Sequence, residues 1–251
     1  MEGNHSINQN PLNPKPTGLA KGKNGFRIGL IFLCGIAAFT HFLVAASSPA
    51  PALSPKDVAL LDEIEKRAVL FFVEQTDPNS GLTRDRAPAN GNPSNARSSV
   101  AATGFALTAW GIAAERGWMP HEAARRHVVT TLRFMIERVD HSRGWLYHFV
   151  TIEEGRRAWE SEASTIDTAL FLQGALFARE YFKDSEINKL VDRLYSRIDW
   201  NWALNGGKTL SHGWRPESGF ISSRWDSYAE MLGLYLLGIG APEHPPPAST
   251  W

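Results

Sequence analysis

Residues 98–114 read SSVAATGFALTAWGIAA and contain no charged side chain. Two later stretches, Thr168–Ala178 and Met231–Gly240, are also free of charge. A helix that is apolar on every side is buried on every side. The sequence therefore predicts three helices that lie inside the protein.

Amphipathic helices are predicted between these stretches, at Ser54–Gln75, Pro120–Val139 and Asp184–Ile198. Their apolar residues recur at helical spacing and form one stripe along each helix. The alternation of amphipathic and apolar helices predicts an all-α fold of six helices in two layers, as in an α/α toroid built from helical hairpins. In the first helix the stripe consists of Leu60, Leu61, Ile64, Ala68, Phe71 and Phe72.

Membrane-spanning helices are the competing explanation for the missing charge. The runs are roughly 11 to 17 residues long, which is short of the ~20 that a bilayer requires. They are also interrupted by Gly104, Gly111 and Gly174. We therefore interpret them as helices buried in protein.

The N-terminal segment has the pattern of an export signal. Residues 1–46 carry basic side chains before the charge-free run Ile28–Ala46, which ends in small residues. This run is also close to the length of a membrane span, so an uncleaved anchor is the alternative. Residues 47–53 are predicted to be a linker. The expected location is the periplasm or the cell surface, with membrane contact only through residues 28–46.

The overall charge excludes some partners. The 26 basic residues balance the 26 acidic residues, so no net field favours nucleic acid. The single cysteine, Cys34, lies in the export segment, so residues 54–251 can form no disulfide. The spacing of His141, His148 and His212 is not that of a metal site, and we predict neither a metal nor a cofactor.

Acidic residues precede two of the apolar helices. Because antiparallel hairpins alternate in direction, all inner helices begin at the same end, and side chains at these starts converge there. Glycoside hydrolysis uses two carboxyl groups on either side of the scissile bond. These starts carry Glu160, Glu162, Ser164, Thr165 and Asp167 in one case, and Arg224, Trp225, Asp226, Tyr228 and Glu230 in the other.

Helix capping is the simpler interpretation of the same residues. Ser164 with Asp167 and Ser227 with Glu230 both match the capping-box spacing. Ser54 and Asp57 match it too, at the start of an outer helix. Spacing alone therefore does not distinguish a cap from a catalytic group.

Six of the nine tryptophans lie in connecting segments instead of helix interiors. Aromatic faces around a cavity can stack on sugar rings, although each indole could equally pack in the core. Two of these segments, Gly144–Trp159 and Thr209–Arg224, alternate apolar and polar residues and are predicted to form short hairpins. The six tryptophans are Trp145, Trp159, Trp200, Trp202, Trp214 and Trp225.

Several motifs between Ser54 and Trp251 resemble one known family. They are QTDP at 75–78, SSVAATGF at 98–105, AAERGW at 113–118, YHF at 147–149, STIDTAL at 164–170, RWDSYAE at 224–230 and LLGIGAP at 236–242. In this order they resemble the bacterial glucoamylase-like domain, which includes the endo-β-1,2-glucanases of glycoside hydrolase family 144.

The resemblance implies an (α/α)6 toroid of which this chain holds six helices, half of a full barrel. It also implies a β-glucan hydrolase, with β-1,2-glucan as the expected substrate. Glu230 is then the candidate general acid, and Asp167 and Asp226 are candidates for positioning the sugar or the attacking water. Substrate contacts are predicted for Trp159, Glu162, Trp214, Arg224, Trp225 and Tyr228.

Three further possibilities follow from the same observations. A half barrel could bind glucan without cleaving it, as a remnant protein. It could also form a homodimer or require a C-terminal half to close the toroid. Polysaccharide lyases use α/α toroids as well, and a Tyr228 base beside Arg224 would suit a lyase.

Overall fold

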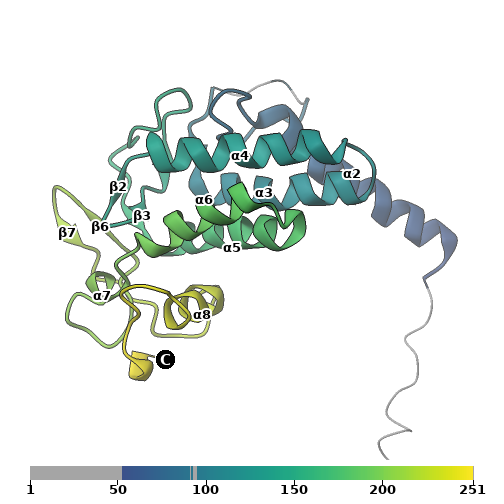
Figure 1. The fold of residues 1–251 in the computed structure, drawn as a ribbon. Coiled ribbons are helices and arrows are strands. Elements are labelled where there is room, and N and C mark those ends of the chain that lie inside the picture. Colours follow the sequence, from purple (N-terminus) through teal and green to yellow (C-terminus); the bar gives the residue numbers. More distant parts are fainter. Residues whose placement is uncertain (1–52, 91, 93–94, 251) are drawn as a thin grey trace, which may run out of the picture. The chain divides into compact units, whose positions relative to one another are not determined.

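The three charge-free stretches form helices that contact one another in a computed structural model of the chain, which describes residues 53–90, 92 and 95–250. Helix α5 lies between the other two and contacts both (Figure 1). The prediction of an inner layer is therefore confirmed. Its members are α3 (Val100–Glu115), α5 (Thr165–Phe182) and α8 (Leu232–Ile239). Burial on every side is not found for α8, however, whose Leu232, Leu236 and Ile239 are exposed.

The amphipathic segments form the outer layer. Helix α2 contacts α3, α4 contacts α3 and α6, and α6 contacts α5. All six helices begin and end within a few residues of the predicted bounds, whereas the short helices α7 (Trp200–Ala203) and η1 (Ala248–Thr250) were not predicted. The outer helices are α2 (Pro55–Gln75), α4 (His121–Glu137) and α6 (Ser185–Ser196).

Two glycines set the distance between α3 and α5. A Cβ atom on Gly174 would lie 1.9 Å from the carbonyl oxygen of Gly104. A Cβ atom on Gly104 would lie 2.4 Å from the Cα atom of Phe171. The two helices therefore approach backbone to backbone, which only residues without a side chain allow.

The connections differ in length at the two ends of the helices. Short turns join α3 to α4 and α5 to α6, whereas the long connections carry the strands, which gather at one end (left in Figure 1). The pairs are β1 (Ser98–Ser99) with β4 (Phe149–Val150), β2 (His141–Ser142) with β3 (Trp145–Leu146), and β6 (Gly213–Arg215) with both β5 (Ala163–Ser164) and β7 (Gly219–Phe220).

The predicted hairpins are partly correct. Strands β6 and β7 form the hairpin expected in 209–224. Within 144–159, a short antiparallel hairpin joins Phe149–Thr151 to Arg156–Ala158 through an isolated bridge between Val150 and Arg157. The start of this segment pairs elsewhere, because β3 pairs back with β2, and β4 also pairs with β1. The start of α3 is thereby tied to the connection between α4 and α5.

Helix α2 departs from the predicted pattern. Leu60, Leu61 and Ile64 of its apolar stripe are more than half exposed, and the only buried residues of the helix are Val69 and Gln75. The reason is that α2 contacts one neighbouring helix, α3, along its C-terminal half.

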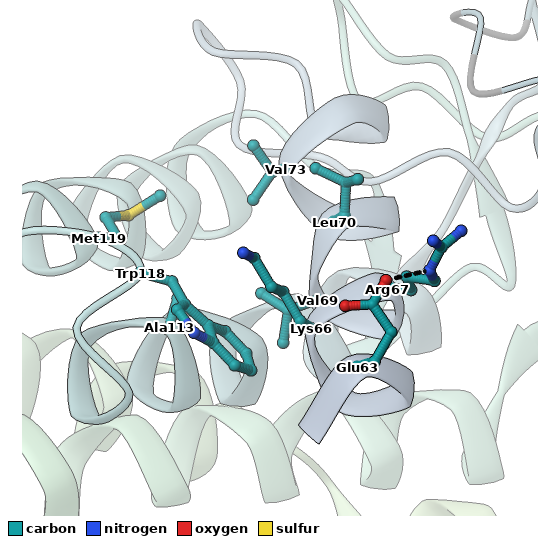
Figure 2. Close-up of a pocket in the computed structure, with 9 residues that line it drawn as sticks. All are labelled: Glu63, Lys66, Arg67, Val69, Leu70, Val73, Ala113, Trp118 and Met119. Carbon is teal, nitrogen blue, oxygen red and sulfur yellow. Dashed lines mark hydrogen bonds and ion pairs between the residues drawn. The ribbon is translucent and has the colours of Figure 1, made fainter. Parts of the chain in front are cut away.

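A groove of about 430 Å³ separates α2 from the turn between α3 and α4, and Figure 2 shows Lys66 reaching across it toward Trp118. The groove lies at the end of α3, away from the starts of the inner helices. Its lining consists of Glu63, Lys66, Arg67, Val69, Leu70, Val73, Ala113, Trp118 and Met119.

The export signal or anchor predicted in residues 1–46, and all but Leu53 of the linker predicted in 47–53, lie outside the described residues. Within the described part, none of the helices has both the length and the apolar character that crossing a bilayer requires.

Candidate active site

The starts of α3 and α5 meet at His148, and the segment before α8 contacts the start of α5. The backbone carbonyl of His148 accepts a hydrogen bond from the N–H of Val100, the first residue of α3. Its own N–H donates to the carbonyl of Glu162, three residues before α5. On the other side of α5, the indole N–H of Trp225 donates to the hydroxyl of Thr165. The predicted convergence of helix starts is therefore present in the structure.

The imidazole of His148 lies between two carboxyl groups. Nδ1 is 3.3 Å from Oε1 of Glu162, and Nε2 is 3.6 Å from Oδ1 of Asp167. The ring of Phe149 stacks on the imidazole at a centroid distance of 3.8 Å. Burial alone would lower the pKa of His148, but the hydrogen bond with Glu162 and the charge of Asp167 raise it overall.

Glu162 is held in its ionised form. The hydrogen bond with His148 is the largest cause, and the nearby charge of Arg215, whose Nη2 is 3.2 Å from Oε2 of Glu162, acts in the same direction. Together they lower the pKa of Glu162 to about 2 despite partial burial. This carboxylate is therefore expected to be negatively charged near neutral pH.

The pKa of Asp167 is shifted in the opposite direction, upward. Its burial raises the pKa, and this outweighs the opposing effects of His148 and of the hydrogen bond from the Ser164 hydroxyl. The charges of Glu162 and Glu230 raise the pKa further. Two neighbouring carboxyl groups whose pKa values move in opposite directions are typical of acid and base pairs in enzymes.

The cap predicted at the start of α5 is formed, because the hydroxyl of Ser164 accepts from the N–H of Asp167; the carboxylate of Asp167 accepts from this hydroxyl and completes the pair side chain to side chain. The box predicted at Ser227 and Glu230 is not formed. Residues 226–230 form bends and a turn, and the N-cap of α8 is Met231, which makes no side-chain cap. Glu230 is thereby left exposed at the mouth of the site instead of capping the helix.

The other predicted residues of the α8 start have different surroundings. Asp226 and Tyr228 are exposed, with 84% of Tyr228 open to solvent. The guanidinium of Arg224 donates to the carbonyls of Leu204 and Thr209, so it holds the loop before α8 in place. The lyase interpretation requires a Tyr228 base beside a free Arg224. This arrangement does not provide one, because Arg224 is bound to backbone carbonyls.

The loop tryptophans differ in burial: two are fully buried, three are partly buried and one is exposed. Trp145 and Trp200 are fully buried and pack edge to face at 4.9 Å, so for these two the core interpretation is correct. Trp202 and Trp214 are partly buried near Phe220, and Trp225 stacks on His212 at 3.9 Å. Trp159 is the exception, with 62% of its surface exposed.

A metal ion could in principle use ligand atoms of His148, Glu162 and Asp167, which lie within 4.8 Å of one another. The two carboxylates, however, face different nitrogens of the same imidazole ring. A metal ligand set converges on one point, with one nitrogen of each histidine directed at the ion. The geometry therefore fits an imidazolium between two carboxylates better than a metal centre.

Comparison with known proteins supports the same fold. No family model matches the chain. A curated relative, an exo β-1,2-glucooligosaccharide sophorohydrolase (non-reducing end) from Parabacteroides distasonis, is 26% identical over an alignment of 201 residues, and the match covers 75% of this chain and 27% of the relative.

Two solved structures can be superimposed on the chain. An endo-β-1,2-glucanase from Chitinophaga pinensis gives a TM-score of 0.70 at 24% identity, covering 79% of this chain and 50% of that one. A candidate glucoamylase from Bacteroides fragilis gives a TM-score of 0.67 at 28% identity, and the match covers 81% of this chain and 51% of that one. The predicted resemblance is confirmed. The chain spans about half of these structures and about a quarter of the curated relative, so its six main helices form part of an α/α toroid.

Two residues of this site, His148 and Arg215, are not among the site residues predicted from the sequence. Both reach Glu162 from strand-bearing connections, 14 and 53 positions away in the chain. The motif YHF at 147–149, part of the family resemblance, was the available signal for His148.

The position of His148 predicts a pH dependence of stability. A histidine with a raised pKa in the folded state stabilises the fold below its ordinary value of 6.5, and this contribution is lost as the pH rises through the raised pKa. As the pH rises from 6.5 through the raised pKa of His148, we expect the melting temperature of the wild type to fall. The His148→Gln variant should lack the part of this fall that is due to the imidazole. Thermal unfolding followed between about pH 5 and 9 would measure it.

The control is His121→Gln, which changes an exposed histidine at the start of α4. This variant should keep the slope of the wild type. Equal slopes for the wild type and His148→Gln above pH 6.5 would contradict the role given to the imidazolium.

Proposed function

We propose that the chain is a glycoside hydrolase acting on β-glucan, with β-1,2-linked glucan as its substrate. The observation that carries the proposal is the group of carboxyls around His148, where Glu162 is ionised and the pKa of Asp167 is raised, with Glu230 beside them. The names of the relatives, a sophorohydrolase and an endo-β-1,2-glucanase, suggest the linkage.

Glu230 is proposed as the general acid. It is exposed at the mouth of the site, where a polymer can reach it, and its charge affects the buried Asp167. In the reaction the carboxylic acid of Glu230 would donate its proton to the glycosidic oxygen as the bond to the anomeric carbon breaks. A water molecule would add to that carbon and lose a proton to a carboxylate.

The remaining acids would position the reactants. Asp167, buried and with a raised pKa, is suited to hydrogen-bonding a sugar hydroxyl or the attacking water, and exposed Asp226 is a second candidate for the same task. Glu162 is held between His148 and Arg215, which keeps negative charge beside the anomeric carbon as positive charge develops there. Trp214, Trp225 and Tyr228 are the proposed sugar contacts.

Incubation of the purified chain with linear β-1,2-glucan tests the proposal, with released oligosaccharides followed by chromatography. Release that grows with time and enzyme concentration is the expected result. Absence of release while the chain still binds the glucan would overturn the hydrolase proposal in favour of the second candidate, a non-catalytic glucan-binding protein.

Exposed apolar faces raise the question of what covers them. Leu60, Leu61 and Ile64 on α2, and Leu232, Leu236 and Ile239 on α8, are each between 41% and 62% exposed. We propose that a second copy of the chain or a C-terminal half of the toroid covers these faces. A mass measured by light scattering would identify a dimer, and a monomer would favour the second possibility.

We also propose that the protein is exported to the periplasm or cell surface, through the basic and apolar pattern of residues 1–46. Fractionation of cells expressing the tagged chain, with and without these residues, tests this proposal.

A further inference from the structure

A second hollow lies near the carboxyl groups that surround His148, on the side of α3. Its volume is about 640 Å³. The segment around Arg86 and the segment around Arg97 run together here, because the N–H of Asp85 donates to the carbonyl of Arg97. The lining consists of Arg86, Asn95, Ala96, Arg97 and Trp159.

An aromatic series connects this hollow with the site. The ring of Phe149 stacks on His148 at 3.8 Å and meets the indole of Trp159 edge to face at 5.1 Å. Asp85, next to Arg86, is close enough for its charge to act on His148. The hollow is lined by segments that precede α3 and α5, whereas Glu230 lies just before α8, which contacts α5.

The indole of Trp159 is held in an exposed position. Trp159 and Glu160 both have left-handed backbones, with φ of 54° and 53°, which is uncommon for residues other than glycine. Hydrogen bonds on either side fix this turn, from the N–H of Ala158 to the carbonyl of Phe149 and from Arg157 to the carbonyl of Ser161. A large apolar plane is thus presented to solvent by a fixed backbone.

The polar groups around this plane are donors. The guanidinium of Arg86 pairs with Asp85, while that of Arg97 makes no side-chain hydrogen bond or ion pair with any residue that the structure describes. A planar indole beside donors of this kind suits a neutral sugar ring, whose apolar face can stack while its hydroxyls accept hydrogen bonds.

We propose that Trp159, Arg86 and Arg97 form a distal subsite that binds a glucosyl unit of the β-glucan chain beyond the cleaved bond, on the α3 side. The inference rests on the proposed action on glucan and adds to it a preference for long chains. A chain that spans from Glu230 past His148 to Trp159 gains this contact, whereas a short oligosaccharide bound near Glu230 does not reach it.

The test compares the affinity of the full chain for two ligands, a long linear β-1,2-glucan and a β-1,2-linked trisaccharide, by isothermal titration calorimetry. Trp159→Ala is expected to weaken binding of the long glucan about ten-fold, equivalent to about 1.4 kcal/mol, and to leave binding of the trisaccharide within about two-fold. Trp159→Phe, which keeps an aromatic plane, should recover part of the loss. Arg97→Ala should also weaken binding of the long glucan selectively.

Phe177→Ala serves as the control, since it removes a partly exposed aromatic ring near the other end of α5 and should change neither affinity. Equal weakening for both ligands, no weakening for either, or a wild type that does not bind long glucan would overturn the distal subsite. Hydrolysis is measured separately, so selective loss of long-chain binding without any cleavage would overturn the proposed hydrolase and leave the subsite standing.

Discussion

Replacing Glu230 with Gln is expected to lower kcat on β-1,2-glucan by about 10²- to 10⁴-fold, the range for loss of a general acid. The amide has nearly the same shape as the carboxylic acid but cannot donate the proton that the leaving oxygen requires. Because Glu230 is exposed and forms no cap on α8, the substitution should leave the melting temperature unchanged. Initial rates over a range of glucan concentrations, together with thermal unfolding, measure both effects.

Glu180→Gln is the matched control. Glu180 is an exposed glutamate near the opposite end of α5, and the same substitution there should keep the activity of the wild type. Activity retained by Glu230→Gln within a factor of about three would show that another group donates the proton. Asp167, with its raised pKa, would then be the next candidate.

Replacing Gly174 with Ala is expected to destabilise the fold by about 3 kcal/mol or more, at or above the upper end of the usual cost of overpacking. The added methyl carbon would overlap the carbonyl oxygen of Gly104, 1.9 Å away, so α3 and α5 would have to separate. For a domain of this size the melting temperature should fall by roughly 6 to 12 °C. Differential scanning calorimetry would measure the change.

Gly111→Ala is the control for this prediction. Both glycines lie in helix interiors, where alanine improves helix propensity by roughly 1 kcal/mol. At Gly111 the nearest atom to an added Cβ belongs to the ring of Phe177, at 2.7 Å, and this partly exposed ring can turn aside. Similar melting temperatures for the two variants would show that the backbone contact at Gly174 does not limit the approach of the helices.

The helices could be predicted from the sequence because charge and periodicity are local properties. Of the uncharged residues, 100–114 and 168–178 do lie within α3 and α5, between outer helices, whereas residues 98 and 99 form β1. The exposure of Leu60, Leu61 and Ile64 could not be predicted, since an apolar stripe indicates which face a neighbour would cover and not whether one is present. Strand pairings such as β1 with β4 depend on contacts between distant segments, which a single sequence does not reveal.

The common end of the helix starts could be predicted for a similar reason. Helix direction alone brings Asp167 and Glu230 to one end, and the effect of the Glu230 charge on the pKa of Asp167 agrees with this. The roles of these residues stay predictions. The capping pattern, however, formed at Ser164 and not at Ser227, because the backbone before α8 turns instead of running extended. Similarly, position in a loop did not distinguish buried Trp145 from exposed Trp159.

The contact between Gly104 and Gly174 also has a consequence for motion. Two helices joined through flexible side chains can slide by rotamer changes, but two backbones in direct contact have no such freedom. Helices α3 and α5 should therefore move as one rigid body, carrying Val100, Glu162 and Asp167 with them. The contact between the two glycines does not include the segment before α8, which carries Glu230.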